Sequence, residues 1–129
     1  MFNLKVITPQ GEYLNAEALS ITLSSVDGKR TVLPNHMPLV LPLAMGSFKL
    51  RTKEGVHEYF SEAGIFTIEH NQARLITSVV ERDDEIDIKR AQRAKKRAEE
   101  RLSAYQETND LVRAEAALKR ALTRLRIKE

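Results

Sequence analysis

The 129-residue sequence is 42% hydrophobic and 30% charged, which is enough apolar material for one core and too little for two independent ones. It contains no cysteine, which excludes disulfides, thiolate metal sites and a cysteine nucleophile, and its three histidines lack metal-ligand spacing. No basic and apolar leader opens the chain, and no apolar run approaches the roughly 20 residues that span a bilayer, so we expect a cytoplasmic location.

The formal net charge of +3 is unevenly distributed along the chain. Residues 1–85 contain 8 Lys and Arg against 11 Asp and Glu, whereas residues 86–129 contain 13 against 7. A basic C-terminal part predicts an anionic partner, either nucleic acid, an acidic protein surface or phosphate groups. A solvated helix face with scattered ion pairs is the ordinary alternative, and charge alone leaves it open.

Apolar and polar residues alternate between Phe2 and Val80, with the clearest runs at 2–6, 19–23 and 66–69. Turn signals separate the runs: TPQGE at 8–12, VDGK at 26–29, KEG at 53–55 and EHNQ at 69–72. Many short strands without interleaved helices predict antiparallel sheets packed as a β-sandwich or flattened barrel. They disfavour a Rossmann-type sheet.

The period changes after Arg82, where the carboxylate-rich stretch RDDE precedes a helical pattern. Two apolar stripes follow at three- and four-residue spacing, and QETND at 106–110 separates them. The stripes consist of Ala91, Ala94, Ala98, Leu102 and Tyr105, and of Leu111, Ala114, Leu118, Ala121 and Leu125. The sequence therefore predicts an α+β protein: an antiparallel β-sandwich domain at 1–83, followed by a two-helix antiparallel hairpin domain at 84–129.

The apolar stripes of the hairpin are rich in alanine. Alanine side chains let two helices approach closely, but at ~25 cal/mol per Å² each contributes much less than leucine or isoleucine. We expect the hairpin to be marginally stable by itself and to need the sandwich, a ligand or a partner, which makes it a candidate moving part.

No motif of enzyme chemistry is present. GKR at 28–30 lacks the upstream glycine of a P-loop, since Leu23 stands there, and no G-x-S-x-G elbow occurs. We therefore expect no catalytic residue, no metal site and no enzyme activity of the chain's own.

The stretch TVLPNHMPLVLPL at 31–43 has a proline at every fourth position, which forbids a helix or a continuous central strand. The segment should bend or lie at a sheet edge while presenting apolar side chains, as a contact loop does. Its predicted partner-contact residues are His36, Met37, Pro38 and Leu39. The alternative is that residues 39–41 cap the sandwich core and that His36 is a turn residue bonded to nearby backbone.

In IDIKRA at 86–91, Asp87 and Arg90 have the spacing of an exposed helical ion pair, worth a few tenths of a kcal/mol. Such a pair does not explain the arginine row that continues along the first helix, or the matching row on the second. The rows consist of Arg90, Arg93, Arg97 and Arg101, and of Arg113, Arg120 and Arg124. Converging guanidinium groups repel one another unless an anion such as phosphate lies between them. Ala91 leaves room for a planar base, and Asp87 or Glu81 could accept from its amino group.

Three stretches together resemble one known family, the epsilon subunits of bacterial rotary ATP synthases. They are GKRTVLPNHMPLV at 28–40, IDIKRA at 86–91 and RAEAALKRALTRL at 113–125. LPNHMPL matches the family pattern Leu-Pro-Gly-His-x-Pro-Leu except at one position, and IDIKRA matches Ile/Leu-Asp-x-x-Arg-Ala at every fixed position. The resemblance covers essentially the whole chain.

The resemblance implies a non-catalytic central-stalk subunit, peripheral at the cytoplasmic face of the cell membrane, that couples the gamma subunit to the ring of c subunits. In the family the hairpin can fold on the sandwich, or extend along gamma toward the alpha and beta subunits of the catalytic head and block ATP hydrolysis. The membrane is reached only through the complex.

The resemblance also implies a regulatory ligand, ATP with or without Mg2+, bound in the compact form without being cleaved. The ATP-binding residues implied are Glu81, Ile86, Asp87, Arg90, Ala91 and Arg97, with Arg120 and Arg124 as weaker candidates. The rival hypothesis is a basic hairpin that binds nucleic acid. It is disfavoured by interleaved glutamates (Glu99, Glu100, Glu107 and Glu115) and by the lack of stacking aromatics other than Tyr105.

The sequence departs from the family pattern in the contact loop. Lys29 and Arg30 stand in the stretch where the family usually has Gly-Glu, and Asn35 replaces the glycine of the turn. Asparagine tolerates a left-handed backbone, so the turn can survive. The charge reversal predicts compensating acidic groups on the ring or on gamma.

Overall fold

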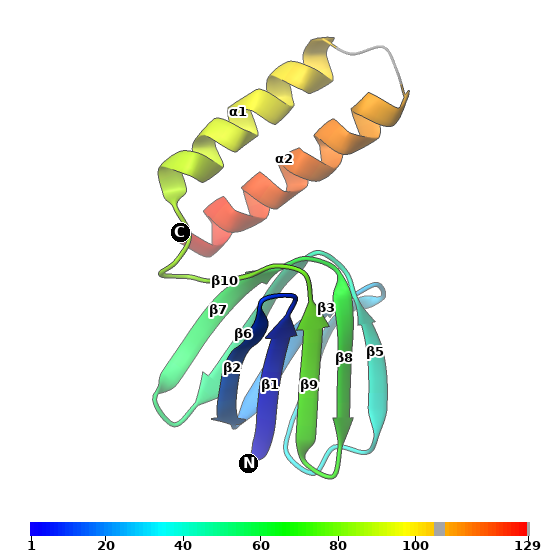
Figure 1. The fold of residues 1–129 in the computed structure, drawn as a ribbon, viewed down its shortest axis with the longest axis vertical. Coiled ribbons are helices and arrows are strands. Elements are labelled where there is room, and N and C mark those ends of the chain that lie inside the picture. Colours follow the sequence, from blue (N-terminus) through cyan, green and yellow to red (C-terminus); the bar gives the residue numbers. More distant parts are fainter. Residues whose placement is uncertain (105–107, 129) are drawn as a thin grey trace. The chain divides into compact units, whose positions relative to one another are not determined.

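The computed structural model describes residues 1–104 and 108–128, and the chain divides into two compact units, Met1–Asp83 and Asp84–Glu129. The first unit is built from strands only and the second from two helices (Figure 1).

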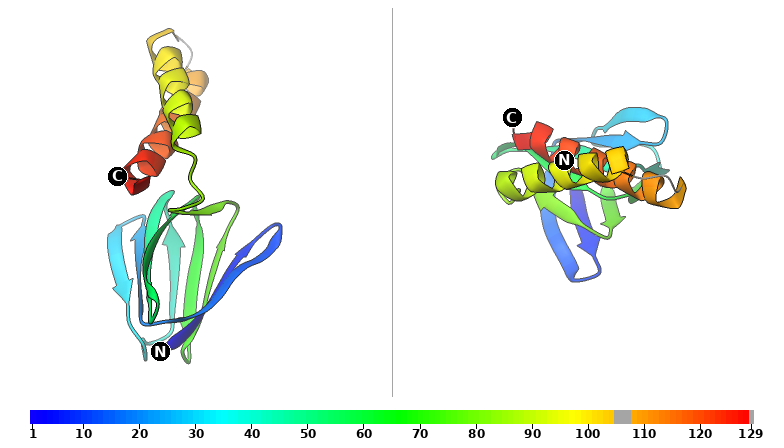
Figure 2. Two further views of the ribbon diagram at one scale, coloured as in Figure 1. Left: turned by 90° about the vertical axis from the view of Figure 1, so that its left-hand side faces the viewer. Right: turned by 90° about the horizontal axis from the view of Figure 1, so that it is seen from above.

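Ten strands form the first unit as one strongly curved sheet, in the order β10-β7-β6-β3-β5-β8-β9-β1-β2, with β4 paired to β3. The strands are β1 Phe2–Thr8, β2 Gly11–Ala18, β3 Ser20–Ser25, β4 Gly28–Val32, β5 Leu39–Leu43, β6 Gly46–Thr52, β7 Gly55–Ser61, β8 Gly64–Glu69, β9 Gln72–Thr77 and β10 Val80–Arg82. Because β2 comes back into contact with β6, the sheet nearly closes on itself, and Figure 2 shows its two layers facing each other. This confirms the predicted sandwich.

One pairing departs from the expected antiparallel pattern, because β1 and β9 run parallel. The two strands are distant in the sequence, so no tight turn joins them and their relative direction is set by the sheet. All other pairings are antiparallel.

Period-two alternation builds the core of the sandwich. In β1, Phe2, Leu4 and Val6 are buried while the residues between them are half-buried, as the sequence predicts. Phe48 and Tyr59 stack at 4.7 Å between ring centroids inside this core. The large buried side chains give the first unit a core of its own.

The predicted turns all lie between strands. Gly28, at φ 123°, closes the β3–β4 turn with a backbone conformation that other residues rarely adopt. In the β8–β9 turn, His70 and Asn71 both have left-handed φ values, 51° and 59°, as a two-residue hairpin turn requires.

The C-terminal end of the first unit is held against β7. The Asp83 backbone N–H donates to the Glu58 carbonyl at 2.9 Å, and the Asp83 carboxylate lies 3.2 Å from Nδ1 of His57. These bonds fix the point from which the chain leaves the sandwich.

In the second unit, α1 spans Ile88–Ala104 and α2 spans Thr108–Lys128, and the two helices lie side by side in opposite directions (Figures 1 and 2). The predicted hairpin is confirmed. Each helix buries two alanines seven residues apart: Ala91 and Ala98 in α1, and Ala114 and Ala121 in α2.

Part of the predicted stripe and loop lies outside the described residues, namely Tyr105, Gln106 and Glu107. The remainder of the predicted loop, residues 108–110, belongs to α2. Threonine, asparagine and aspartate are poor interior helix formers, but they are favoured at a helix beginning, which explains why the polar stretch starts a helix there.

Candidate functional site

The predicted contact loop occupies residues 33–38 between β4 and β5. Met37 is 74% exposed and Pro38 is also exposed, whereas His36 and Leu39 are half-buried. The His36 ring contacts the Met37 carbonyl through Nδ1 at 2.7 Å. The loop therefore presents the Met37 side chain to solvent.

The alternative role of the stretch, capping the core, applies to part of it. Leu41 is 6% exposed within the core, and Leu39 packs against that core. Val40 is 70% exposed because residues of a strand alternate between faces. Pro42 is tolerated because β5 pairs along its length with β8 and with β3 only at one position, so the strand is nearly an edge.

An apolar row crosses the outer face of the sheet near the C-terminal end of β5, away from this loop. The pairings Pro42 with Ile65, Ile65 with Ile76, and Ile76 with Ile7 place these side chains in register across four strands. Ile65 and Ile76 are 48% and 50% exposed. Together with Val40, these residues form what we call the apolar row, and contiguous exposed apolar groups of this kind mark interaction surfaces.

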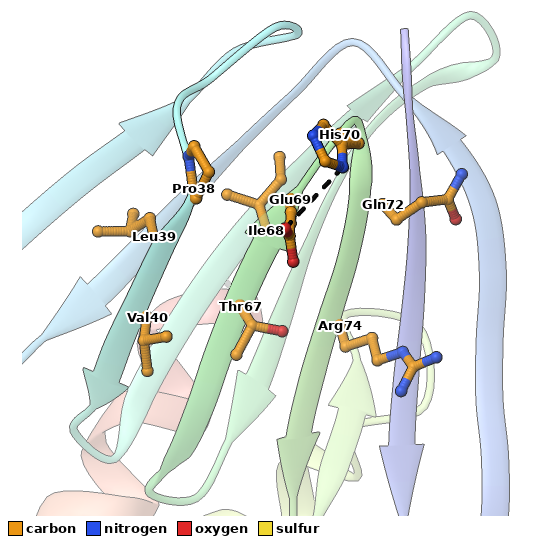
Figure 3. A pocket seen from close by; sticks show the side chains of 9 residues that line it. All are labelled: Pro38, Leu39, Val40, Thr67, Ile68, Glu69, His70, Gln72 and Arg74. Carbon is orange, nitrogen blue, oxygen red and sulfur yellow. Dashed lines mark ion pairs between the residues drawn. The ribbon is translucent and has the colours of Figure 1, made fainter.

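A shallow hollow of about 690 Å³ adjoins the loop at the other end of the same strands (Figure 3). Apolar residues from β5 line one part of it, and Glu69, His70 and Arg74 from β8, β9 and their turn line another. The Glu69–His70 contact of 3.9 Å is largely exposed to solvent and contributes little. The loop, the hollow and the apolar row together form a mixed surface that suits a protein partner.

No feature of the sequence indicates that the contact loop is hydrogen-bonded to the β8–β9 turn. Asn35 and Asn71 exchange two hydrogen bonds, at 2.7 and 2.9 Å. The turn signal at 69–72 and the unusual Asn35 were both visible in the sequence, but nothing connected them.

The spacing of Asp87 and Arg90 serves a helix cap. The Asp87 carboxylate accepts a hydrogen bond from the backbone N–H of Arg90 at 3.1 Å, while its carbonyl accepts from the N–H of Ala91 at 3.0 Å. Asp87 is thus the N-cap of α1, whose first turn contains no acidic residue. The cap prevails because it satisfies an otherwise unpaired helix N–H, whereas an exposed ion pair gains little.

The remaining predicted ATP-binding residues differ in exposure. Arg90 and Arg97 are exposed on α1, whereas Arg120 and Arg124 on α2 are half-buried and interact with neighbouring groups. Ala91 is 3% exposed, which leaves it within the hairpin rather than on an open surface. Ile86 is buried as well, and Glu81 is half-buried in β10, opposite Phe60 of β7.

The antiparallel hairpin brings some of these residues to one end. The beginning of α1, with Asp87 and Arg90, lies beside the end of α2, which contains Arg124 (Figure 1). Arg97 lies two turns further along α1. Glu81 belongs to the other unit, so its part in a common site stays a prediction, as does convergence of the arginine rows.

Within residues 1–104 and 108–128, no group of three or more histidine, aspartate or glutamate side chains could hold a metal ion. Neither helix, over the residues that the structure describes, is long and apolar enough to cross a membrane.

Sandwich and hairpin together define a two-part α+β protein with exposed apolar side chains on one unit and exposed arginines on the other. Residues 1–83 match the family model of the β-sandwich domain of the ATP synthase delta/epsilon chain, and residues 84–129 match that of its long α-helix domain. The chain therefore belongs to the ATP synthase delta/epsilon chain family, which confirms the resemblance found in the sequence.

Similar proteins include the ATP synthase epsilon chain of Clostridium kluyveri, which is 38% identical over 128 residues, 98% of this chain and 96% of that one. The ATP synthase epsilon chain of Moorella thermoacetica is 39% identical over 125 residues, 96% of this chain and 93% of its own length. Among solved structures, a chain of the mitochondrial ATP synthase of Euglena gracilis shares the fold with a TM-score of 0.80 at 22% identity, over 90% of this chain and 74% of that one.

Replacing Asp87 tests the capping role. Asp87→Ala should lower the free energy of unfolding of the hairpin by ~1 kcal/mol, because the Arg90 amide loses its acceptor, whereas Asp87→Asn should be nearly neutral because asparagine also caps. Urea unfolding followed by circular dichroism in the helical region measures both. Equal losses for alanine and asparagine would show that the negative charge, and not the cap, is what matters.

Proposed function

We propose that the chain is the non-catalytic central-stalk subunit of a proton-translocating ATP synthase and that its two units have separate tasks. The sandwich couples gamma to the c ring, and the hairpin regulates ATP hydrolysis by the catalytic head. The observation that carries the proposal is the match of both units, over the whole chain, to one family of ATP synthase subunits. Held through these partners, the subunit is peripheral at the cytoplasmic face of the cell membrane.

The surface of the sandwich supports its docking task. Met37 of the contact loop and Val40 of the apolar row are each at least 70% exposed, and an apolar surface of this kind is normally covered by a partner. Lys29 and Arg30 are exposed on β4, which pairs with β3 alone. An acidic patch on the ring or on gamma would complement them.

Met37→Asp should weaken binding of the full chain to gamma and to the gamma–c-ring subcomplex by about tenfold or more, because a buried anchor is replaced by a desolvated charge. Val56→Asp is the control, since Val56 is likewise an exposed apolar side chain, at 53%, but lies near the beginning of β7 and outside the contact loop. Surface plasmon resonance with the immobilised subcomplex measures both affinities. Unchanged binding of Met37→Asp would contradict the docking role of the loop.

The hairpin supports the regulatory task through its weak internal contacts and its charge. Because four of its buried side chains are alanines, we expect a small free-energy difference between the packed and the open hairpin, which a ligand can shift. ATP bound only by the compact form stabilises that form by RT ln(1+[L]/Kd), about 2.7 kcal/mol at a hundredfold excess over Kd.

When ATP is scarce, this bias disappears. The extended helices then bring exposed guanidinium groups such as Arg90 and Arg97 to acidic surface on the alpha and beta subunits, where attraction and apolar burial stabilise the inhibitory form. Hydrolysis of ATP is blocked under the conditions in which it would be most wasteful.

In this assignment Arg90, at the beginning of α1, meets the phosphates of ATP, with Arg97 as a second contact. Asp87 has one carboxylate oxygen engaged in the cap, which leaves the other to accept from the amino group of the base. Ala91, Ile86 and Glu81 complete the base side, and Arg120 and Arg124 would add contacts from α2. Mg2+ would bind through the phosphates.

Arg90→Ala should weaken ATP binding by about tenfold or more, because a charge-assisted contact worth ~1.5–3 kcal/mol is lost. Arg93→Ala is the matched control: it removes an equally exposed arginine of the same helix that is not assigned to the site. Isothermal titration calorimetry with ATP and Mg2+ compares the two. Equal weakening by both variants would indicate a diffuse basic field in place of a site.

A nucleic-acid-binding hairpin remains the rival hypothesis for the basic surface. Exposed Glu99 and Glu100 interrupt the arginines on α1, which weakens the field that a phosphate backbone would meet. A stalk subunit should co-purify with gamma. A nucleic-acid binder should instead co-purify with nucleic acid, which shows as ultraviolet absorption by its bases in excess of that of the protein.

A further inference from the structure

Two asparagines connect the contact loop to the β8–β9 turn through a reciprocal pair of hydrogen bonds. The Asn35 backbone N–H donates to Oδ1 of Asn71 at 2.7 Å, and Nδ2 of Asn71 donates to Oδ1 of Asn35 at 2.9 Å. Asn35 contributes its backbone N–H and its side-chain oxygen, and Asn71 contributes both the oxygen and the nitrogen of its side-chain amide. The two residues are 36 positions apart in the sequence, so this contact is tertiary.

The backbone at both positions is left-handed, with φ 64° at Asn35 and 59° at Asn71. Among residues with a side chain, asparagine adopts this conformation most readily. Glycine would adopt it with less strain but could neither accept at position 35 nor donate and accept at position 71. The choice of asparagine thus serves the backbone and the cross-link together.

Asn71 is itself anchored to a third segment. Its carbonyl accepts a hydrogen bond from the N–H of Asn3 at 2.9 Å, close to the beginning of β1. Asn71 is therefore hydrogen-bonded both to the contact loop and to β1. Through these bonds the sheet restrains the loop.

The held residue directly precedes the exposed part of the loop. Pro34 and Pro38 restrict the backbone near each end of the loop, but they have no N–H to donate. The hydrogen bonds of Asn35 therefore connect the loop to the rest of the sheet, which the prolines cannot do. Between loop and turn lies a hollow of about 380 Å³, lined by Asn35, His36, Pro38, His70 and Asn71. Loop and turn form its two walls.

We infer that the Asn35–Asn71 pair is a positioning clamp that presets the contact loop for docking and makes the β8–β9 turn part of the same interaction surface. A loop that is already ordered loses less conformational entropy on binding, so the clamp acts on partner affinity without itself touching the partner. The inference rests on the proposed docking function of the loop. The surface suits a protein partner with a preformed shape, which meets Met37 and His70 together.

The clamp can be tested with glycine substitutions, which keep the left-handed backbone and remove only the side-chain bonds. Asn71→Gly removes both hydrogen bonds, and Asn35→Gly removes one. In the free full chain, hydrogen exchange of the Asn35 amide should become about three- to tenfold faster in Asn71→Gly, corresponding to one lost hydrogen bond. Gln72→Ala is the control, because this exposed neighbour makes no side-chain hydrogen bond.

Affinity for the gamma–c-ring subcomplex should fall about three- to tenfold in Asn71→Gly, and less in Asn35→Gly. The double variant should bind no more weakly than Asn71→Gly alone, because the bonds removed by the first change are already gone. Additive losses, or unchanged amide exchange, would overturn the clamp.

Comparing Asn71→Gly with Met37→Asp distinguishes a failure of the clamp from a failure of the proposed docking function. If Met37→Asp weakens binding while Asn71→Gly does not, the loop docks but is not preset by the clamp, and the inference is wrong. If both leave binding unchanged although exchange is faster in Asn71→Gly, the docking function itself is wrong and the inference falls with it.

Discussion

The alanine seam between α1 and α2 is the constraint on which the behaviour of this chain depends. Ala91 and Ala98 on one helix, and Ala114 and Ala121 on the other, are buried where larger residues would normally fill a helix interface. At ~0.8 kcal/mol per buried methylene, each contributes about 2 kcal/mol less than a leucine in the same place. The sandwich, by contrast, buries three phenylalanines in its main core: Phe2, Phe48 and Phe66. We therefore expect the sandwich to be stable alone and the hairpin to depend on what it binds.

The positive charge of the hairpin favours anionic partners. The arginine row of α1 is exposed over its whole length, and several like charges on one helix oppose close packing unless anions neutralise them. A nucleotide and an acidic protein surface are both anions, and they would select different arrangements of the same helices. The proposed docking face on the sandwich requires no anion, because its loop is hydrogen-bonded to Asn71 and its apolar side chains are exposed.

The sequence was informative where a local pattern determines structure. Alternation at Phe2, Leu4 and Val6 predicts β1 and its inner face, and the turn signals mark the hairpins because glycine and asparagine supply the left-handed backbone. The stripes of α1 and α2 were likewise visible at helical spacing. These features depend on residues within a few positions of one another.

What could not be predicted depends on tertiary neighbours. The apolar row required knowing that β5, β8, β9 and β1 lie side by side, since Ile65 and Ile76 alone look like ordinary strand residues. The bond between Asn35 and Asn71 joins segments whose proximity no local pattern encodes. The capping role of Asp87 was not predicted, because the spacing of three fits both a side-chain ion pair and a cap, and only the position of the helix beginning distinguishes them.

The proposed regulation requires the hairpin to change position relative to the sandwich when it binds ATP. Because the chain has no cysteine, donor and acceptor dyes can be placed at two exposed lysines, through Lys53→Cys on the sandwich and Lys119→Cys on α2. Energy transfer between them, followed while ATP and Mg2+ are added and removed, measures the change directly. We predict a saturable and reversible shortening of the mean distance. A distance that stays constant up to saturating ATP, in a protein that calorimetry shows to have bound it, would rule out the proposed regulation.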